Sequence, residues 1–305
     1  MDDITVVENY PHPEENPVWS SIFGNSRHPD LAQPVFLRHN GLPVNLIDLY
    51  HGETCYLLGR GPSLSKILED AETKSLLMHH SVIRYGMNTS PEVVGYHCHL
   101  WSGVDRMNKF PSQILKNPTI LKLVPLNRFY LRGYHVAKGK EQQETMAYGN
   151  VFTANCPNTL GVHCYLLNDD TKGKISFGKS YLSSPSVLYG YYRGFKSVML
   201  FSMKIAILLG FKKIVFLGVD FKMNATNPYY KQDLEHYSKF HVDHNNNLYQ
   251  FLAPTIKEIN DLLKAKTNGY NVELVSATKI DLMPFIPVIN LKDLLKSEVS
   301  RKTSG

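Results

Sequence analysis

A glycine-rich turn between an apolar run and a helical pattern is the part of this chain that most directly indicates chemistry. The apolar residues 55–58 lead into the turn, and helix-forming residues follow it. Backbone N–H groups in such a turn, with the dipole of the helix behind them, can hold a phosphate. The nearest acidic residues of the segment come only at Glu69 and Asp70, so no carboxylate is expected at the start of the helix. A plain strand–helix corner has the same pattern. The predicted phosphate-binding residues are Gly59, Arg60, Gly61, Pro62 and Ser63.

A second apolar run also ends at a glycine-containing turn. Residues 214–217 are apolar without alternation, follow a helical segment at 197–211, and end at Gly218 and Asp220. Such a run is typical of a strand buried on both faces of a parallel sheet. Ligands collect at the carboxyl ends of such strands. We therefore expect the polar residues that follow the strands to bind the same ligand as the turn, with Asp220 either contacting a ribose hydroxyl or capping the loop. These residues are Asn88, Ser102, Gly218 and Asp220.

Several short motifs resemble those of one enzyme family. They are GRGPSL at 59–64, RYGMN at 84–88, and ILLGFKKI at 207–214 running into GVDF at 218–221. These motifs resemble the bacterial sialyltransferases of glycosyltransferase family 42, and they are similar to flagellin-modifying glycosyltransferases and archaeal hydroxymethylpterin pyrophosphokinases. The resemblance covers about residues 51–290. It implies a Rossmann-like domain that takes a nucleotide-sugar as co-substrate and needs no metal ion.

The resemblance also implies catalytic residues. A His-Tyr pair at 236–237 lies where these transferases carry their histidine base, which makes His241, or else His244, the expected base. A histidine that is neutral near pH 7 can remove the proton of an acceptor hydroxyl. Lys222 stands at the first of two tyrosine positions that assist the leaving phosphate, and Tyr229 and Tyr230 lie close to the second. Either histidine also fits a polar loop residue without a catalytic role.

The positive charge of the chain is concentrated in one segment. The net charge is +6, but residues 106–219 hold sixteen Lys or Arg against four acidic residues, which leaves −6 for the remainder. Two stretches, RFYLRGYH at 128–135 and YGYYRGFK at 189–196, interleave basic and aromatic residues. Basic groups bind phosphates and rings stack on bases, so the pattern favours nucleic acid as acceptor. A basic lid over an anionic donor is the alternative. The predicted acceptor-binding residues are Arg128, Arg132, Tyr134, Tyr192, Arg193 and Lys196.

These observations predict a metal-independent, inverting glycosyltransferase. Its favoured acceptor is a hydroxymethylated base, such as hydroxymethylcytosine, in double-stranded DNA, which would suit a bacteriophage enzyme. A glycan- or protein-directed sialyltransferase-like enzyme is one alternative. A pterin-type pyrophosphokinase is another, with Mg²⁺ on Asp105 and Asp220. A non-catalytic nucleic-acid-binding module would explain the charge but not the polar strand ends.

The composition indicates the cellular compartment of the protein and argues against a metal site. The chain of 305 residues is 43% hydrophobic, yet no run approaches the ~18 uncharged apolar residues of a membrane span. Its start lacks the basic and apolar segments of a signal peptide, so a cytoplasmic protein is expected. The four cysteines include no C-x-x-C pair and are expected to be reduced. The sequence His97-Cys98-His99 lacks a well-spaced third ligand, which disfavours a metal site.

The predicted fold class is α/β, with a Rossmann-like, mostly parallel sheet, helices on both faces and an embedded lid. An N-terminal arm over 1–50 is expected to pack on the core through Trp19 and Phe23. The transferase domain is expected at 51–290, with a lid or acceptor insertion at about 125–196, and a flexible tail at 291–305. Further strands are predicted at 54–58, 82–85, 95–101, 119–124 and 272–275, and helices at 63–77, 197–210 and 251–266.

Overall fold

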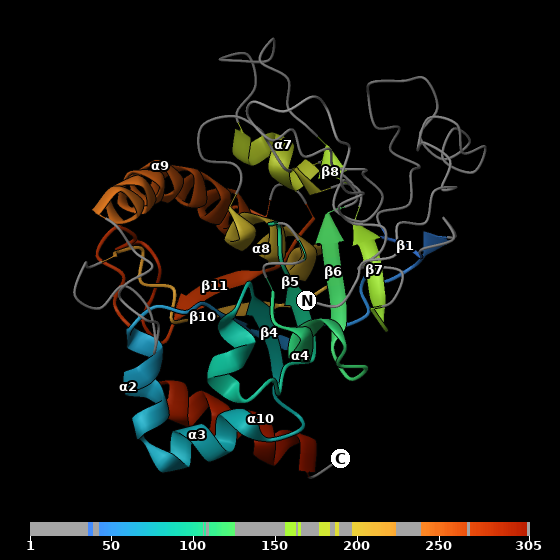
Figure 1. Cartoon of the computed structure of the whole chain (residues 1–305). Helices are drawn as coiled ribbons and strands as arrows, with labels where there is room; N and C mark the ends of the chain where they lie inside the picture. The colour runs from blue at the N-terminus through green and yellow to red at the C-terminus, as the bar shows by residue number, and fades with distance from the viewer. Residues whose placement is uncertain are drawn as a thin grey trace, which may run out of the picture.

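The predicted α/β class is confirmed by the computed structural model. A nine-stranded, mostly parallel sheet forms the middle layer and helices cover both of its faces (Figure 1). The structure describes residues 36–38, 43–105, 107, 110–125, 156–162, 164–165, 177–183, 187–188, 197–223, 239–266 and 269–303.

Seven neighbouring strands of the sheet run parallel, and two short strands close one edge in antiparallel pairing. Every residue of the central strands β3 and β4 is buried, which explains why their sequences are apolar without alternation. A separate parallel pair is formed by β8 (Cys164–Tyr165) and β9 (Val187–Leu188). In spatial order, the main sheet holds β11 (Glu273–Ser276), β10 (Lys213–Leu217), β3 (Thr54–Leu58), β4 (Ile83–Met87), β5 (Leu100–Ser102), β6 (Leu121–Pro125), β7 (Thr159–Val162), β1 (Phe36–Leu37) and β2 (Pro43–Val44).

Strand β3 shows how the two faces are filled. Its residues Cys55 and Leu57 pack into a core with one set of helices, whereas Tyr56 and Leu58 pack with another. This follows from the period of two along a strand. The first set is α7 (Phe177–Ser183), α8 (Val198–Leu208) and α9 (Lys239–Lys264); the second is α2 (Ser63–Glu69), α3 (Ala71–Met78), η1 (Ser90–Val94) and α10 (Leu291–Thr303); the short α4 (Ser112–Leu115) packs in a third, smaller cluster.

The strand order places a topological switch point beside β3. The chain moves from β3 through β4, β5 and β6 to β7, and later returns to β10 on the opposite side of β3. In open α/β sheets, ligands bind outside the carboxyl ends of the strands where the order reverses in this way. The glycine-rich turn after β3 and the loop after β10 therefore meet at the position where the fold favours a ligand.

Two helices differ from the sequence prediction. The helix expected over 63–77 is broken at Asp70, which adopts an extended backbone and accepts hydrogen bonds from the N–H groups of Glu72 and Thr73 to start α3. Helix α9 begins at Lys239, twelve residues before the predicted start, and includes Pro254. His241 and His244, for which a polar loop was the alternative to a catalytic role, therefore belong to a helix.

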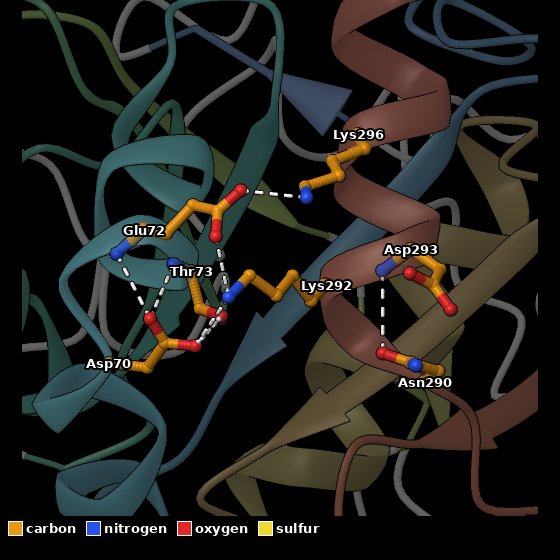
Figure 2. A network of polar contacts seen from close by, with 7 residues as sticks. All are labelled: Asp70, Glu72, Thr73, Asn290, Lys292, Asp293 and Lys296. Atoms are coloured by element: carbon orange, nitrogen blue, oxygen red, sulfur yellow. Dashed lines mark hydrogen bonds and ion pairs between the residues drawn. The ribbon is translucent and has the colours of Figure 1, made fainter.

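The flexible tail predicted over 291–305 is wrong, because α10 occupies residues up to Thr303. On one side of this helix, Leu291 and Leu295 are buried in the core against the sheet. On its other side, Lys292 and Lys296 form ion pairs with Glu72 at 2.6 and 2.7 Å, as Figure 2 shows. Apolar burial and ion pairing together hold the helix on α3.

Parts of the predicted arm and lid belong to the core. Strand β1 of the arm joins the sheet through β7, and Phe36 is buried. Strand β7 itself, together with Tyr181 of α7, comes from the segment assigned to the lid. Trp19 and Phe23 lie outside the described residues.

Two further properties concern the described residues only. None of their helices combines the length and apolar character that a membrane span requires. Cys55 and Cys98 are buried, free thiols, and burial raises the pKa of both, that of Cys98 to about 12. A buried thiol with a raised pKa is a core residue and a poor nucleophile.

Candidate functional site

The turn after β3 is joined to the loop after β10 by backbone hydrogen bonds. The Gly59 N–H donates to the Leu217 carbonyl at 2.7 Å, and the Gly61 N–H donates to the Gly218 carbonyl at 2.7 Å. A Cβ on Gly59 would lie 2.3 Å from the Gly218 oxygen, closer than any side chain can approach. The glycines of the turn are therefore required by the contact between two loops.

Asp220 caps the helix that follows the turn. Its Oδ2 accepts a hydrogen bond of 2.9 Å from the Ser63 N–H at the start of α2. A Cβ on Gly61 would lie 2.3 Å from the same oxygen. The prediction that no carboxylate lies at this helix start is wrong, because the carboxylate comes from another strand, 157 residues along the chain. Of the two roles predicted for Asp220, the cap is the one present in the structure.

This arrangement changes how the turn can bind a phosphate. The N–H groups of Gly59, Gly61 and Ser63 already donate to the β10 loop. Those of Leu64 and Ser65 donate to the carbonyls of the turn itself. Pro62 has no N–H group. These five N–H groups are thus used by the protein itself, which favours side chains over these parts of the backbone as the groups that contact a ligand.

Arg60 carries the positive charge of the turn and is held by the element after β4. Its Nη1 lies 2.9 Å from Glu92 Oε2 of η1 and donates to the Thr89 hydroxyl. The Arg60 side chain is 13% exposed and that of Glu92 is 29% exposed. The guanidinium is therefore fixed at the carboxyl edge of the sheet, between β3 and β4.

Asn88 has a left-handed backbone and an unsatisfied side chain. It adopts φ +49°, a left-handed conformation that is uncommon for residues other than glycine. Its backbone is fixed by β5, since its N–H donates to the Ser102 carbonyl and its carbonyl accepts from Trp101 Nε1. Its Oδ1 is buried and has no hydrogen-bond partner among the described residues, and the same holds for the Ser63 hydroxyl. Unpaired buried polar atoms call for an explanation, and a ligand that binds them is one.

Ser102 is committed to the core. Its hydroxyl donates to the Leu123 carbonyl at 2.8 Å and lies 2.6 Å from the Tyr85 hydroxyl. The residue has no exposed surface. This arrangement gives no support to the prediction that Ser102 contacts the nucleotide-sugar.

The first half of α9 is attached to the loop after β10. The Met223 N–H donates to Asn246 Oδ1 at 2.7 Å, and Asn246 Nδ2 donates back to the Met223 carbonyl at 3.0 Å. The rings of Phe221, at φ +50°, and Tyr249 lie 5.2 Å apart. Lys222, which is exposed, lies within this joined segment.

The two candidate bases lie on the attached helix. His244 is exposed two positions before Asn246, and His241 lies three positions earlier in α9, where only its backbone is described. The structure thus brings the histidine-bearing helix to the strand end that carries Lys222. Sequence reasoning missed Asn246, although the run Asn245-Asn246-Asn247 is a poor helix former and so signals a contact made by the side chains.

The remaining predicted contacts cannot be placed. They lie outside the described residues, and their roles stay predictions: Tyr229, Tyr230, Arg128, Arg132, Tyr134, Tyr192, Arg193 and Lys196.

Part of the charge assigned to a basic face lies in the core. Lys122 has no exposed surface, and its Nζ donates to the carbonyls of Asn117, Ile120 and Pro157 at 2.6–2.9 Å. Lys204 also has none, and its Nζ donates to the Leu182 carbonyl at 3.1 Å. Burial lowers the pKa of Lys122 to about 8 and that of Lys204 to about 7. Lys122 and Lys204 therefore cannot contact a polyanion, and the basic surface is smaller than the sequence suggested.

The described residues contain no group of three or more His, Cys, Asp or Glu arranged to hold a metal ion. Within the His97-Cys98-His99 sequence, the His99 ring accepts from the Arg84 N–H and contacts the His80 carbonyl. Burial and the nearby Arg84 lower the pKa of His99. This histidine has a structural role at the amino ends of β4 and β5.

No protein-family model matches this chain, and neither a curated protein nor a solved structure is significantly similar to it. The fold and the site geometry are therefore the basis for any functional assignment.

Proposed function

We propose that this protein is a glycosyltransferase that binds a nucleotide-sugar at the carboxyl edge of the sheet, between β10, β3 and β4. The observation that carries the proposal is the pair of buried, unpaired polar atoms, Asn88 Oδ1 and Ser63 Oγ, beside the switch point of the sheet. An unpaired buried polar group costs about 1–3 kcal/mol. A ligand with hydrogen-bond donors and phosphate oxygens would satisfy both atoms.

The two atoms suggest distinct contacts with a donor. Asn88 Oδ1 is an acceptor and would take an N–H or O–H group of the nucleotide, whereas the Ser63 hydroxyl can donate to a phosphate oxygen. Lys222 would neutralise the phosphate that leaves, and a histidine of α9, His241 or His244, would take the acceptor proton. The Asn246–Met223 contact supports this, because it holds α9 beside the loop that carries Lys222.

Donor binding is tested with a panel of nucleotides and nucleotide-sugars. We expect one nucleotide to bind wild-type protein and to bind an Asn88→Ala variant about tenfold more weakly or worse, since a lost hydrogen bond to a buried group is worth about 1–3 kcal/mol. Asn271→Ala is the matched control, because Asn271 is exposed at the amino-terminal edge near β11. Equal affinity of the Asn88 and Asn271 variants would refute the assignment of the site.

We further propose that the acceptor is a hydroxymethylated base, such as hydroxymethylcytosine, in DNA. The support is the sequence segment 106–219, which keeps a large positive excess even without its two buried lysines. The test is binding of duplex DNA, plain or hydroxymethylated, at several salt concentrations. A slope of log affinity against log salt that corresponds to about four or more phosphate contacts would support it. Absence of binding at low salt would direct the search to glycan or protein acceptors.

A pterin-type pyrophosphokinase is the competing enzyme class. That reaction needs Mg²⁺, so it would be abolished by EDTA, whereas the proposed sugar transfer would continue. Substitution of both His241 and His244 by Ala would stop the transfer but leave simple nucleic-acid binding unchanged, which separates an enzyme from a binding module.

A further inference from the structure

The turn after β3 leaves one cationic group for an anionic ligand. Its backbone N–H groups at Gly59, Gly61 and Ser63 are used by the β10 loop. We propose that the Arg60 guanidinium is the phosphate-binding group of this edge, and that Glu92 is a built-in competitor which the ligand displaces. The proposal rests on the nucleotide-sugar site proposed above. It assigns the phosphate contact of that site to Arg60 and the group that blocks this contact in the absence of ligand to Glu92.

The position of Arg60 fits this role. Its contact with the Thr89 hydroxyl brings the guanidinium to the residue that follows Asn88, whose Oδ1 is unpaired, and Ser63 is three residues along the same turn. A guanidinium presents several N–H donors in a planar fork that matches a phosphate. The three groups together offer donors for a phosphate and an acceptor for the rest of the ligand.

Local charge explains why Glu92 acts as a gate. Two carboxylates contact this short stretch, Asp220 at the Ser63 N–H and Glu92 at Arg60. With Arg60 paired, a phosphate meets no net positive charge at the turn. Glu92 is more exposed than Arg60, so it can move into water while the guanidinium stays in place. Exchange of Glu92 for a phosphate would then preserve the charge-assisted hydrogen bonds of Arg60.

The test measures binding of inorganic pyrophosphate by titration calorimetry at low ionic strength. We expect Glu92→Gln to bind it about five- to tenfold more tightly than wild type, the effect of removing one competing charged contact. Arg60→Gln should lose the binding. Glu69→Gln is the matched control: it makes the same charge change at an exposed position of α2 and should bind as wild type does.

Three results would overturn the proposal: equal affinity of Glu92→Gln and wild type, retained binding by Arg60→Gln, or a gain for Glu69→Gln as large as that for Glu92→Gln. Absence of pyrophosphate binding in every variant would overturn it too. Because the probe carries no sugar and no base, the outcome does not depend on transfer activity. Failure of the nucleotide-sugar panel with a positive pyrophosphate result would instead refute the proposed function and keep the anion site. Circular dichroism and thermal unfolding of each variant verify that it is folded.

Discussion

Replacing the buried lysine of α8 by methionine should stabilise this protein, and the gain should depend on pH. Lys204 has no exposed surface, donates to the Leu182 carbonyl, and has the rings of Tyr181 and Tyr270 at 5.7 and 5.3 Å from its Nζ. Burial is the cause that lowers its pKa from 10.5 to about 7. Methionine has a similar length and carries no charge to desolvate.

The sign and size of the effect follow from proton linkage. Between about pH 7 and pH 10.5, Lys204 is neutral in the folded state and protonated in the unfolded chain, so wild-type stability rises with pH across this window. Below pH 7 both states are protonated and the penalty is complete. A difference of about 3.5 pKa units corresponds to about 5 kcal/mol. The substitution leaves the Leu182 carbonyl without its donor, which costs about 1–2 kcal/mol. We therefore expect a net gain of about 3–4 kcal/mol at pH 7.

Urea unfolding of wild type and Lys204→Met at intervals from pH 6 to pH 10 measures this. The gain should be constant below pH 7 and should shrink as the pH rises toward 10.5. Other titrating groups are the same in both proteins and cancel in the difference. Lys122→Met is the matched control. The pKa of Lys122 is lowered less, from 10.5 to about 8, which corresponds to about 3 kcal/mol. Three carbonyls lose their donor at about 1–2 kcal/mol each, so this variant should show no gain and a loss of up to about 3 kcal/mol.

The reasoning about Lys204 would be refuted by a difference between variant and wild type that does not change with pH. A loss of stability on Lys204→Met at pH 7 would refute it as well. Either result would mean that the Lys204 amine is solvated, or paired with an acidic group, in the folded protein.

Three further predictions concern the packing around the site and α10. Gly61→Ala should lower the free energy of unfolding by about 1–3 kcal/mol in urea titrations, because its Cβ would lie 2.3 Å from Asp220 Oδ2; an unchanged midpoint would contradict the close packing. Asp220→Ala should cost about 1 kcal/mol by removing the cap at the Ser63 N–H, and Asp220→Asn, which keeps an oxygen acceptor, should cost less. The hydrogen bond from Lys292 lowers the pKa of Asp70 from 3.8 to about 2, so its stabilising contribution is complete above pH 3.8 and is lost as the pH falls toward 2. Hydrogen exchange in α10 should therefore accelerate more across that window in wild type than in Asp70→Asn, which keeps the Glu72 ion pairs, and the same acceleration in both proteins would exclude the Asp70–Lys292 contact in Figure 2 as its cause.

The parallel sheet could be predicted because its central strands are buried on both faces. Strand β3 lies at residues 54–58, as predicted, and β4, β6, β10 and β11 lie within two residues of the predicted runs. Each of these strands is a short apolar run that a helix or turn signal bounds, so local sequence was sufficient. The strands β1 and β7, toward the antiparallel end of the sheet, were missed, since two to four residues carry too little pattern to identify a strand.

Helix α10 and the first turns of helix α9 could not be predicted from local sequence. Helix α10 is polar over most of its length, and what holds it is contact with distant residues, such as the Tyr56 hydroxyl on Glu298 and the ion pairs to Glu72. The first turns of α9 contain three successive asparagines, which disfavour a helix by themselves. Asn246 is instead used to bind the backbone of Met223.

The sequence by itself determined which residue types stand at the carboxyl ends of the strands, because a strand and the polar residue that follows it are continuous in the chain. Gly59, Asn88 and Gly218 could be placed at one edge on that basis. Only the tertiary structure decided what those residues contact. The N–H groups of Gly59, Gly61 and Ser63 are used by the end of β10 and the loop after it, Asp220 fills the helix start that a phosphate was expected to occupy, and Glu92 holds Arg60. These contacts join residues far apart in sequence, and the geometry that creates them arises only when the sheet has assembled.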